Sequence, residues 1–328
     1  MRIATFNLES LDLSPKAEAT LEARAEVLRP ALERLEADIL CLQEVNGQHV
    51  PGQRHRTLAA LDQLLAGTRY VSYARVATTG RSGLGVAGVH NLVILSRFPI
   101  RNHQEVKHQF VEAPRHRLFT ASPRPADPEA IQFDRPLLLA EIELPSSESV
   151  VVVNLHLRAP LASHVPGQKL EPFVWRTIAG WAEGYFLSSL RRASQALELR
   201  LLLEQVLDAD AHKMIAVAGD FNAEDHEVPL TIVLAAEENT GNSALAARSL
   251  VLLDRALPGD RRWSVLHHGR HQMLDHILVS RTLYARFKAI EVHNETLGDE
   301  LVIYAKHLRT LGSCHAGVVA EFALAAGG

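Results

Sequence analysis

Short apolar runs that end in polar residues recur along the whole chain. Runs of four to eight β-branched and aliphatic residues bounded by turn formers are typical of buried strands. We expect strands at residues 2–7, 37–44, 70–76, 91–96, 135–144, 149–157, 215–218, 273–280 and 315–324. The cluster PSSES joins two of them as a turn. Strands separated by helical segments indicate a layered α/β protein.

Three segments show helical periodicity instead. Over residues 18–36 the apolar positions Leu21, Ala25, Leu28, Leu32 and Leu35 recur at helical spacing. A second helix is expected at 56–66, and the longest at 173–207. The last one contains Trp175, Trp181 and Tyr185, which we expect to pack in the core or under a lid rather than to form a platform for stacking bases.

The connecting segments favour one domain over residues 1–328. GRSGLGVAG, residues 80–88, lacks the Lys-Ser/Thr of a phosphate-binding P-loop and does not lie between a strand and a helix. We therefore interpret it as a flexible hairpin connection. Residues 112–132 and 158–172 are expected to be surface excursions. No linker or internal repeat divides the chain.

Charge and composition limit the function. The chain has 328 residues, 47% of them hydrophobic, and 34 Lys and Arg against 38 Asp and Glu give a net charge of −4. Proteins that grip long stretches of nucleic-acid backbone are usually basic, because phosphate neutralisation dominates their affinity. The balance argues against a broad non-specific DNA binder and leaves room for small phosphate esters.

Neither a leader nor a membrane span is evident. The first residues, MRIATFNLES, begin as a strand, and no apolar run reaches membrane-spanning length. Two distant cysteines, Cys41 and Cys314, do not form a disulfide framework. We expect a cytoplasmic protein with no membrane partner and no obligate protein partner.

Several of the predicted strands carry Asn, Asp, Glu or His at one end. Asn7 and Glu9 follow the first strand, and Glu44 ends the second. Each has an ordinary explanation by itself, since a terminal Asn or Asp often caps a turn. Asn154 and His156, Asp220 and Asn222, Asp275 and His315 occupy similar positions on four further strands. In a sandwich of two sheets these ends can meet in one cleft.

That many acidic groups in one cleft point to a cation. Like charges repel unless a positive ion neutralises them, and burying a bare carboxylate is costly. Carboxylate and amide oxygens suit Mg²⁺ or Mn²⁺. The chain has no CxxC or HExxH spacing, so zinc is not the first choice.

The ordered motifs TFNLE, LQEV, NLHL, GDFNAE, LDHILVS and S-x-H resemble those of the endonuclease/exonuclease/phosphatase superfamily. The likeness extends from residue 2 to about residue 322. It implies a four-layer α/β sandwich, in which two mixed β-sheets pack face to face with helices outside. It also implies divalent-metal-dependent hydrolysis of phosphate esters, in nucleic acid or in a small diester or monoester.

The resemblance assigns metal ligands from the first part of the chain. Glu44 matches the principal ligand, and Asn7 and Glu9 match residues that help to hold the metal or its waters. The usual C-terminal signature Ser-Asp-His-x-Pro is here Ser-Cys-His-Ala-Gly. Cys314 therefore stands where many members have an aspartate ligand, and a thiol is a poor ligand for Mg²⁺.

The resemblance also assigns the catalytic groups. Asp220 matches the residue that orients or activates the attacking water, and Asn222 its partner at the scissile phosphate. His315 matches the catalytic histidine, Asp275 the carboxylate that holds it, and His156 a second histidine beside the phosphate. We also expect Arg135 and Asn154 to contact substrate, the arginine on a looser match.

Three functional hypotheses follow. The leading one is a metal-dependent phosphoesterase with a water nucleophile. A degenerate, non-catalytic member that binds a phosphorylated ligand or a protein partner is the alternative that Cys314 raises. A third makes Cys314 a nucleophile with His315 as its base, which would need a looped backbone because neighbours on a strand point to opposite faces.

Overall fold

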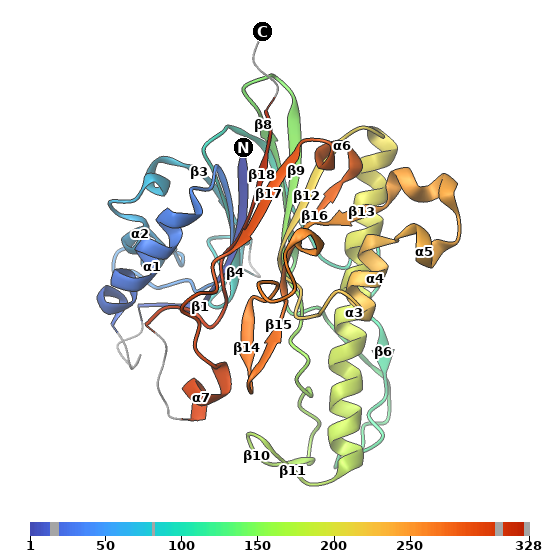
Figure 1. Ribbon diagram of the computed structural model, residues 1–328. Coiled ribbons are helices and arrows are strands. Elements are labelled where there is room, and N and C mark those ends of the chain that lie inside the picture. The colour runs from blue at the N-terminus through green and yellow to red at the C-terminus, as the bar shows by residue number, and fades with distance from the viewer. Residues whose placement is uncertain (14–19, 81–82, 306–310, 325–328) are drawn as a thin grey trace.

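Two six-stranded sheets lie face to face at the centre of the protein, with helices on their outer sides (Figure 1). The computed structural model describes residues 1–13, 20–80, 83–305 and 311–324. Residues 18 and 19, the expected start of the first helix, and residues 81 and 82 of the glycine-rich segment lie outside this part. The fold is the α/β sandwich that the sequence predicted.

The first sheet has the order β17-β18-β1-β2-β4-β3. Its central pair β1–β2 is parallel, and its other neighbours are antiparallel. The strands are β1 (Arg2–Leu11), β2 (Ile39–Val45), β3 (Ala74–Ala77), β4 (Asn91–Ser96), β17 (Phe287–Val292) and β18 (Val318–Phe322).

The second sheet repeats this arrangement with the order β13-β16-β12-β9-β8-β5. Here β12 and β9 form the parallel pair, and the other neighbours are again antiparallel. The strands are β5 (Ile100–Val106), β8 (Leu137–Glu143), β9 (Ser149–His156), β12 (Met214–Asp220), β13 (Leu250–Leu252) and β16 (Asp275–Ser280).

Helices cover the outer face of each sheet. The α-helices are α1 (Leu21–Leu35), α2 (Ala59–Leu65), α3 (Ile178–Ala209), α4 (Val228–Leu234), α5 (Glu237–Thr240), α6 (Arg281–Tyr284) and α7 (Glu300–Ala305); 3₁₀ turns are η1 (Arg69–Ser72), η2 (Ser243–Arg248) and η3 (Leu253–Ala256). The hydroxyl of Thr20 caps α1, and that of Thr177 caps α3.

Three apolar clusters hold the layers together. Between the sheets, inward residues such as Ile94, Val152 and Ile277 pack against one another. On the outer sides, α1 and α2 pack through residues such as Leu32, and α3 and α4 through residues such as Leu202. Because side chains alternate along each strand, each sheet packs against an apolar core on both of its faces. The two sheets and the helices outside them form four layers.

The edges of the sheets differ most from the sequence-based expectation. The segment 70–76 divides into η1 and the short strand β3. Strands β5 and β17 were not predicted, because edge strands such as IRNHQEV expose most of their side chains and lack an apolar run. The short helices α4 to α7 were also missed.

Three small hairpins extend beyond the sheets: β6 (Arg115–His116) with β7 (Glu129–Ala130), β10 (Lys169–Glu171) with β11 (Val174–Trp175), and β14 (Val265–His267) with β15 (Arg270–Gln272). Helix α3 begins at Ile178 rather than at residue 173, because 174 and 175 belong to β11. Trp181 is 45% exposed and Tyr185 38%, so the expectation that they pack in the core or under a lid is wrong. Trp175 does pack against a small apolar cluster.

Candidate active site

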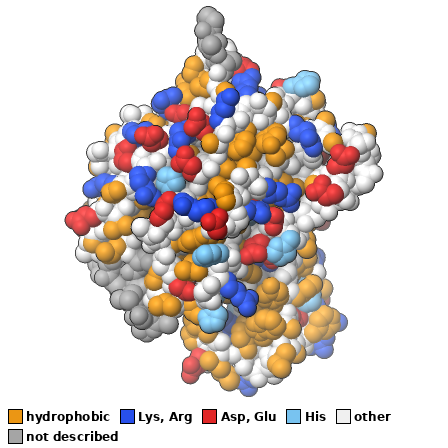
Figure 2. Space-filling view, in the orientation of Figure 1, with side chains coloured by type: hydrophobic (Ala, Val, Ile, Leu, Met, Phe, Trp, Pro, Cys, Tyr) orange, Lys and Arg blue, Asp and Glu red, His pale blue; other side chains and the backbone are white. Residues whose placement is uncertain are grey.

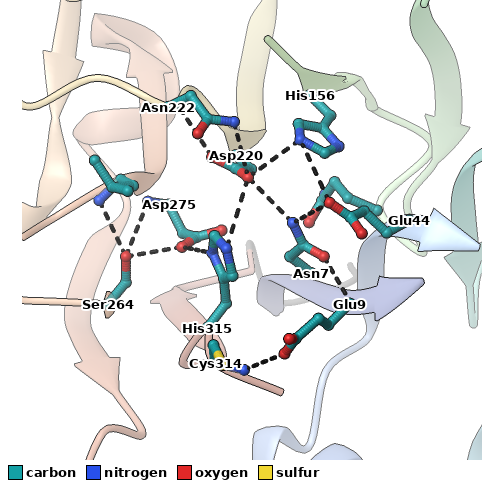
Figure 3. A network of polar contacts seen from close by, with 12 residues as sticks. Asn7, Glu9, Glu44, His156, Asp220, Asn222, Ser264, Asp275, Cys314 and His315 are labelled. Carbon is teal, nitrogen blue, oxygen red and sulfur yellow. Dashed lines mark hydrogen bonds and ion pairs between the residues drawn. The ribbon is translucent and has the colours of Figure 1, made fainter. Parts of the chain in front are cut away.

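Strand register in the second sheet brings three predicted site residues into one row. Asp220, the last residue of β12, lies directly opposite His156 on β9 and opposite Asp275 on β16. Partners on adjacent strands have side chains within reach of each other. The row lies at the ends of these three strands, next to Asn7 and Glu44 of the first sheet (Figure 3).

The first sheet supplies a carboxylate held by backbone geometry. After Asn7 the chain turns through left-handed conformations at Glu9 and Ser10, with φ of 49° and 53°. This turn lets Ser10 donate from its backbone N–H and its hydroxyl to Glu44 Oε2, at 2.9 and 3.1 Å. The other oxygen, Oε1, lies 3.5 Å from Asn7 Nδ2 and 3.8 Å from His156 Nε2, so it is only loosely engaged.

Asp220 is the hub of the network. Its Oδ2 accepts from Asn7 Nδ2 at 3.1 Å and Asn222 Nδ2 at 3.2 Å, and its Oδ1 accepts from the Asn222 backbone at 2.8 Å. His156 Nε2 lies 3.3 Å from Oδ2. Burial, and then the negative charge of Asp275, raise the pKa of Asp220 to about 7. A carboxyl group with such a pKa can gain or lose a proton near neutral pH.

His315 and Asp275 form a close pair. His315 Nδ1 lies 2.7 Å from Asp275 Oδ2, which also accepts from the Ser264 hydroxyl at 2.7 Å. The other ring nitrogen, Nε2, lies 4.0 Å from Asp220 Oδ2. Burial would lower the pKa of His315, but the charges of Asp275 and Asp220 outweigh it and raise the pKa well above its ordinary value. The imidazole is therefore charged in this setting.

Two further histidines, His156 and His90, lie beside the network. The rings of His156 and His90 stack with centroids 6.1 Å apart. Burial and the charge of Arg135 hold the pKa of His156 well below its ordinary value, so this ring is neutral. Arg135 Nη1 donates to the carbonyl of His156 at 2.8 Å, and Nη2 lies 3.3 Å from His90 Nδ1. Arg135 thus contacts both histidines.

Asn154 does not reach the cleft. It is fully buried between the sheets, where Nδ2 donates to the carbonyls of Leu42 at 3.0 Å and Val93 at 2.9 Å. Its Oδ1 accepts from Gln43 Nε2 at 2.7 Å. This placement contradicts the expectation that Asn154 contacts substrate. It ties the two sheets together instead, since a buried amide must satisfy its polar atoms.

Cys314 lies beside the site but is buried, with 1% of its surface exposed. Its backbone N–H donates to Glu9 Oε2 at 2.6 Å, which brings two of the predicted metal residues together. Within the described residues, one ligand atom each from Asp220, Asp275 and His315 lie within 4.8 Å of one another. Glu9, Glu44 and Cys314 do not form such a compact set in that part of the chain.

The donors nevertheless fit a hard divalent cation. Glu44 Oε1 has only long contacts, and Asp275 Oδ1 is buried without a hydrogen-bond partner among the described residues. Burial alone would raise the pKa of Glu44, but the charges of His90, His315 and Arg135 outweigh it and lower the pKa. Ionised carboxylate oxygens with spare capacity are the ligands that Mg²⁺ and Mn²⁺ prefer.

Sequence reasoning missed Ser10, His90 and Ser264. Ser10 and Ser264 donate hydrogen bonds to Glu44 and Asp275, and His90 lies 3.7 Å from Glu44 Oε2. Left-handed backbone conformations could not be seen either: Glu9, Ser10, Glu44, His90 and Asn222 all have φ between 48° and 57°. Non-glycine residues adopt this region at an energetic cost, and such residues gather at functional sites. A histidine just before an apolar strand, as in VHNLVIL, was the available signal for His90.

A groove of about 1270 Å³ adjoins the site through His90 and Arg135. Arg54, Arg56 and Arg191 also line it. Within the described residues, no carboxylate lies within 4.0 Å of any of these four guanidinium groups. Lys107 and two acids, Glu105 and Asp134, line the groove as well, and the charge of Asp134 acts on Arg135 and Arg191. The groove therefore has more cations than acids, which favours anions.

Comparisons with known proteins agree with this architecture. The model of the "Endonuclease/Exonuclease/phosphatase family" matches residues 4–295. None of the curated proteins matches the chain.

Among solved structures, the chain is similar to truncated Caenorhabditis elegans TDP2, with a TM-score of 0.55 and 15% identity over 98% of this chain and 96% of that one. It is also similar to an AP endonuclease from Archaeoglobus fulgidus, with a TM-score of 0.53 and 15% identity over 99% and 100% of the two chains. The chain is similar as well to the 3′ phosphatase NExo from Neisseria bound to a product DNA hairpin. The TM-score is 0.51, with 18% identity over 99% of this chain and 100% of that one. At these identities the structures show the fold, and the family model shows that the chain belongs to the endonuclease/exonuclease/phosphatase family, whose members are phosphoesterases.

Proposed function

We propose that the protein hydrolyses phosphate esters with a water nucleophile and a bound divalent metal ion. The observation that carries the proposal is the network around Asp220, where a carboxyl with a pKa near 7 lies between the charged His315 and the neutral His156. Groups with their pKa values driven apart in one cleft are typical of acid–base catalysis.

The proposed roles follow from protonation. Asp220, when ionised, accepts a proton from the attacking water through Oδ2. His315, kept as an imidazolium by Asp275, presents Nε2–H to the negative charge that develops on the phosphoryl and leaving oxygens. Asn222 and neutral His156 donate hydrogen bonds to the phosphate. A positioned acid or base of this kind contributes about 10²–10⁴-fold in rate.

Glu44, with Asn7 and Glu9, would hold Mg²⁺ or Mn²⁺. A bound ion neutralises charge on the non-bridging oxygens of the phosphate and can assist the leaving group. Cys314 adds no hard donor to this group. We expect the site to bind the ion more weakly than one with a carboxylate at that position.

The arginine-lined groove favours a substrate that carries more than one phosphate. A monoester would occupy only the catalytic end, whereas a nucleic-acid strand could place further phosphates beside Arg54, Arg56 and Arg191. Two structures similar to this chain were solved with DNA products, the DNA hairpin complex of NExo and D. rerio TDP2 with a single-strand DNA product. Both observations support a nucleic-acid strand as the substrate.

The test is hydrolysis of bis(p-nitrophenyl) phosphate and of a single-stranded oligonucleotide, with Mg²⁺, with Mn²⁺ and with EDTA. We expect metal-dependent turnover of both, lowered by about 10³-fold in Asp220→Asn. The alternative, a non-catalytic member that binds phosphorylated ligands, predicts oligonucleotide binding without turnover in any metal. Turnover that survives EDTA and stops on alkylation of Cys314 would instead support the thiol mechanism.

A further inference from the structure

The first turns of α3 project past the end of the sheets together with the hairpins β10–β11 and β6–β7 (Figure 1). We call this part, residues 115–131 and 161–187, the end lobe. Its own apolar cluster is small: four buried residues, Ala121, Ile131, Val165 and Leu187. The lobe therefore buries few of its hydrophobic side chains, and many are left on its surface (Figure 2).

In this lobe, helix α3 has its polar face buried and its apolar face exposed. The stripe that faces inward, at positions 180, 183, 184, 187 and 188, reads Gly, Glu, Gly, Leu, Ser and is buried. The stripe that faces solvent, at positions 178, 181, 182, 185 and 186, reads Ile, Trp, Ala, Tyr, Phe and is exposed. A helix that served only the fold would present these faces the other way round.

Polar packing explains the inner face. Glu183 accepts from the backbone N–H groups of Phe119 and Thr120 at 2.7 and 2.8 Å and lies 2.8 Å from His116 Nε2. A side chain added at Gly184 would meet the carbonyl of Ser163 at 2.4 Å, so the helix needs glycine to come this close. On the outer face, Phe186 packs against His116 with ring centroids 5.3 Å apart, and Trp181 and Tyr185 stack on each other at 5.5 Å. Trp181, Tyr185 and Phe186 are still 38–48% exposed.

The tip of the lobe is more exposed still. Phe173, between β10 and β11, is 89% exposed, and Ile178 is 86% exposed, the two highest values among the large hydrophobic residues described. Leu170 and Val174 on the same hairpin are 58% and 46% exposed. Aliphatic and aromatic side chains together form a projecting apolar surface, rather than a groove.

The lobe carries more cations than acids on its surface. The exposed acids of the lobe are Asp127, Glu129 and Glu171, against five cations, Arg115, Arg117, Arg124, Lys169 and Arg176. This excess contrasts with the net charge of −4 for the whole chain. Among the described residues, no carboxylate lies within 4.0 Å of the guanidinium group of any of the four arginines.

We propose that the end lobe docks on the surface of an anionic lipid bilayer. Apolar and aromatic side chains that enter the interface, with Lys and Arg around them, are the pattern of peripheral membrane binding. Leu170, Ile178 and Val174 cannot stack on bases, and the surface is convex, so a nucleic acid fits less well. The proposal departs from the sequence-based expectation of no membrane partner.

The expectation of no membrane partner rested on the lack of an apolar run of membrane-spanning length. None of the described helices is long and apolar enough to cross a membrane. Binding at the interface needs no such helix.

The experiment is co-sedimentation of the full chain with phosphatidylcholine vesicles, with and without phosphatidylserine. We expect binding that phosphatidylserine strengthens. The double variant Phe173→Ser/Ile178→Ser should lower the vesicle partition coefficient by roughly tenfold or more, because two apolar side chains no longer enter the interface. Arg117→Glu/Arg176→Glu should remove the preference for phosphatidylserine. The matched control Val71→Ser/Val228→Ser changes residues that are 65% and 59% exposed elsewhere and should bind like the unchanged protein.

Other outcomes would overturn the proposal. Absence of vesicle binding would do so directly. A concentration-dependent dimer that Phe173→Ser/Ile178→Ser converts to monomer would show that the surface meets a second copy of the chain. Loss of oligonucleotide affinity in the same variant, with vesicle binding unchanged, would show that it binds nucleic acid. Hydrolysis of bis(p-nitrophenyl) phosphate, followed in parallel, reports separately on the proposed function.

Discussion

The two sheets have the same plan, and comparison of their ends explains the site. In each, a central parallel pair, β1–β2 or β12–β9, is flanked by antiparallel strands in the same order. Corresponding strands therefore end at one cleft. Asn7 at β1 meets Asp220 at β12, 3.1 Å apart, and Glu44 at β2 lies 3.8 Å from His156 at β9.

A third correspondence completes the pattern. Asp275 begins β16 of the second sheet and His315 precedes β18 of the first, and the two are 2.7 Å apart. The difference between the sheets lies in chemistry. The first contributes Asn7, Glu9 and Glu44, oxygen donors suited to a metal, whereas the second contributes Asp220, Asn222 and His156, which we assign to water and phosphate. His315 is the exception, because it precedes a strand of the first sheet and we assign it to proton donation.

This division makes a testable distinction. Substitutions in the second sheet should lower kcat even at saturating metal. Those in the first sheet should mainly raise the metal concentration required, because they weaken binding of the ion without removing an acid or base.

The largest effect is expected for Asp220→Asn. The amide keeps the shape but cannot accept a proton, so kcat should fall by about 10³-fold at saturating Mg²⁺. Steady-state hydrolysis of bis(p-nitrophenyl) phosphate measures this loss. If high Mg²⁺ restored kcat, Asp220 would belong with the metal-binding residues instead.

The same variant carries its own folding control. The pKa of Asp220 rises from 3.8 to about 7 on folding, so the folded protein binds this proton more tightly than the unfolded chain. The associated stability is present below the unfolded pKa and is lost as the pH rises towards 7. Without metal at pH 8, Asp220→Asn should therefore melt no lower than the unchanged protein, as differential scanning calorimetry can check.

The Asp275–His315 pair should come next. Asp275→Asn and His315→Ala should each lower kcat by about 10²-fold, and the double variant by little more, because residues that act as a unit are strongly non-additive. The measurement is kcat for the four proteins of the cycle. Multiplicative losses would mean that the two residues act separately and that the contact across the sheets is structural.

Glu44→Gln tests the first sheet. Removing the charge should weaken Mg²⁺ binding by about tenfold or more, or about 1.4 kcal/mol, as followed by isothermal titration calorimetry. At saturating Mg²⁺ most of kcat should return. Unchanged affinity would remove Glu44 from the metal site, and Ser10→Ala, which takes away one of its hydrogen bonds, should show a smaller shift in the same direction.

The sequence predicted the fold and most of the residues that meet, because apolar runs mark buried strands and polar residues at their ends are conspicuous. Edge strands such as β5 were missed because half-exposed strands carry no apolar run. Asn154 was misplaced because its type and position do not reveal that its side chain points between the sheets. His90 and Ser10 were missed because their roles depend on left-handed backbone turns, and β-branched or apolar patterns do not encode these.

The smallest effect is expected at Cys314, where this chain departs from the pattern that its motifs resemble. The backbone of Cys314 bonds to Glu9 Oε2 at 2.6 Å, so a carboxylate at this position would add a hard donor beside an existing one. Cys314→Asp should lower the Mg²⁺ concentration for half-maximal activity by roughly threefold to tenfold, about 0.7–1.4 kcal/mol, with little change in kcat. Cys314→Ser, similar in size and uncharged, is the control and should titrate like the unchanged protein. Identical Mg²⁺ curves for all three would place the side chain of residue 314 outside the metal's surroundings, and activity lost in both variants would favour a chemical role for the thiol.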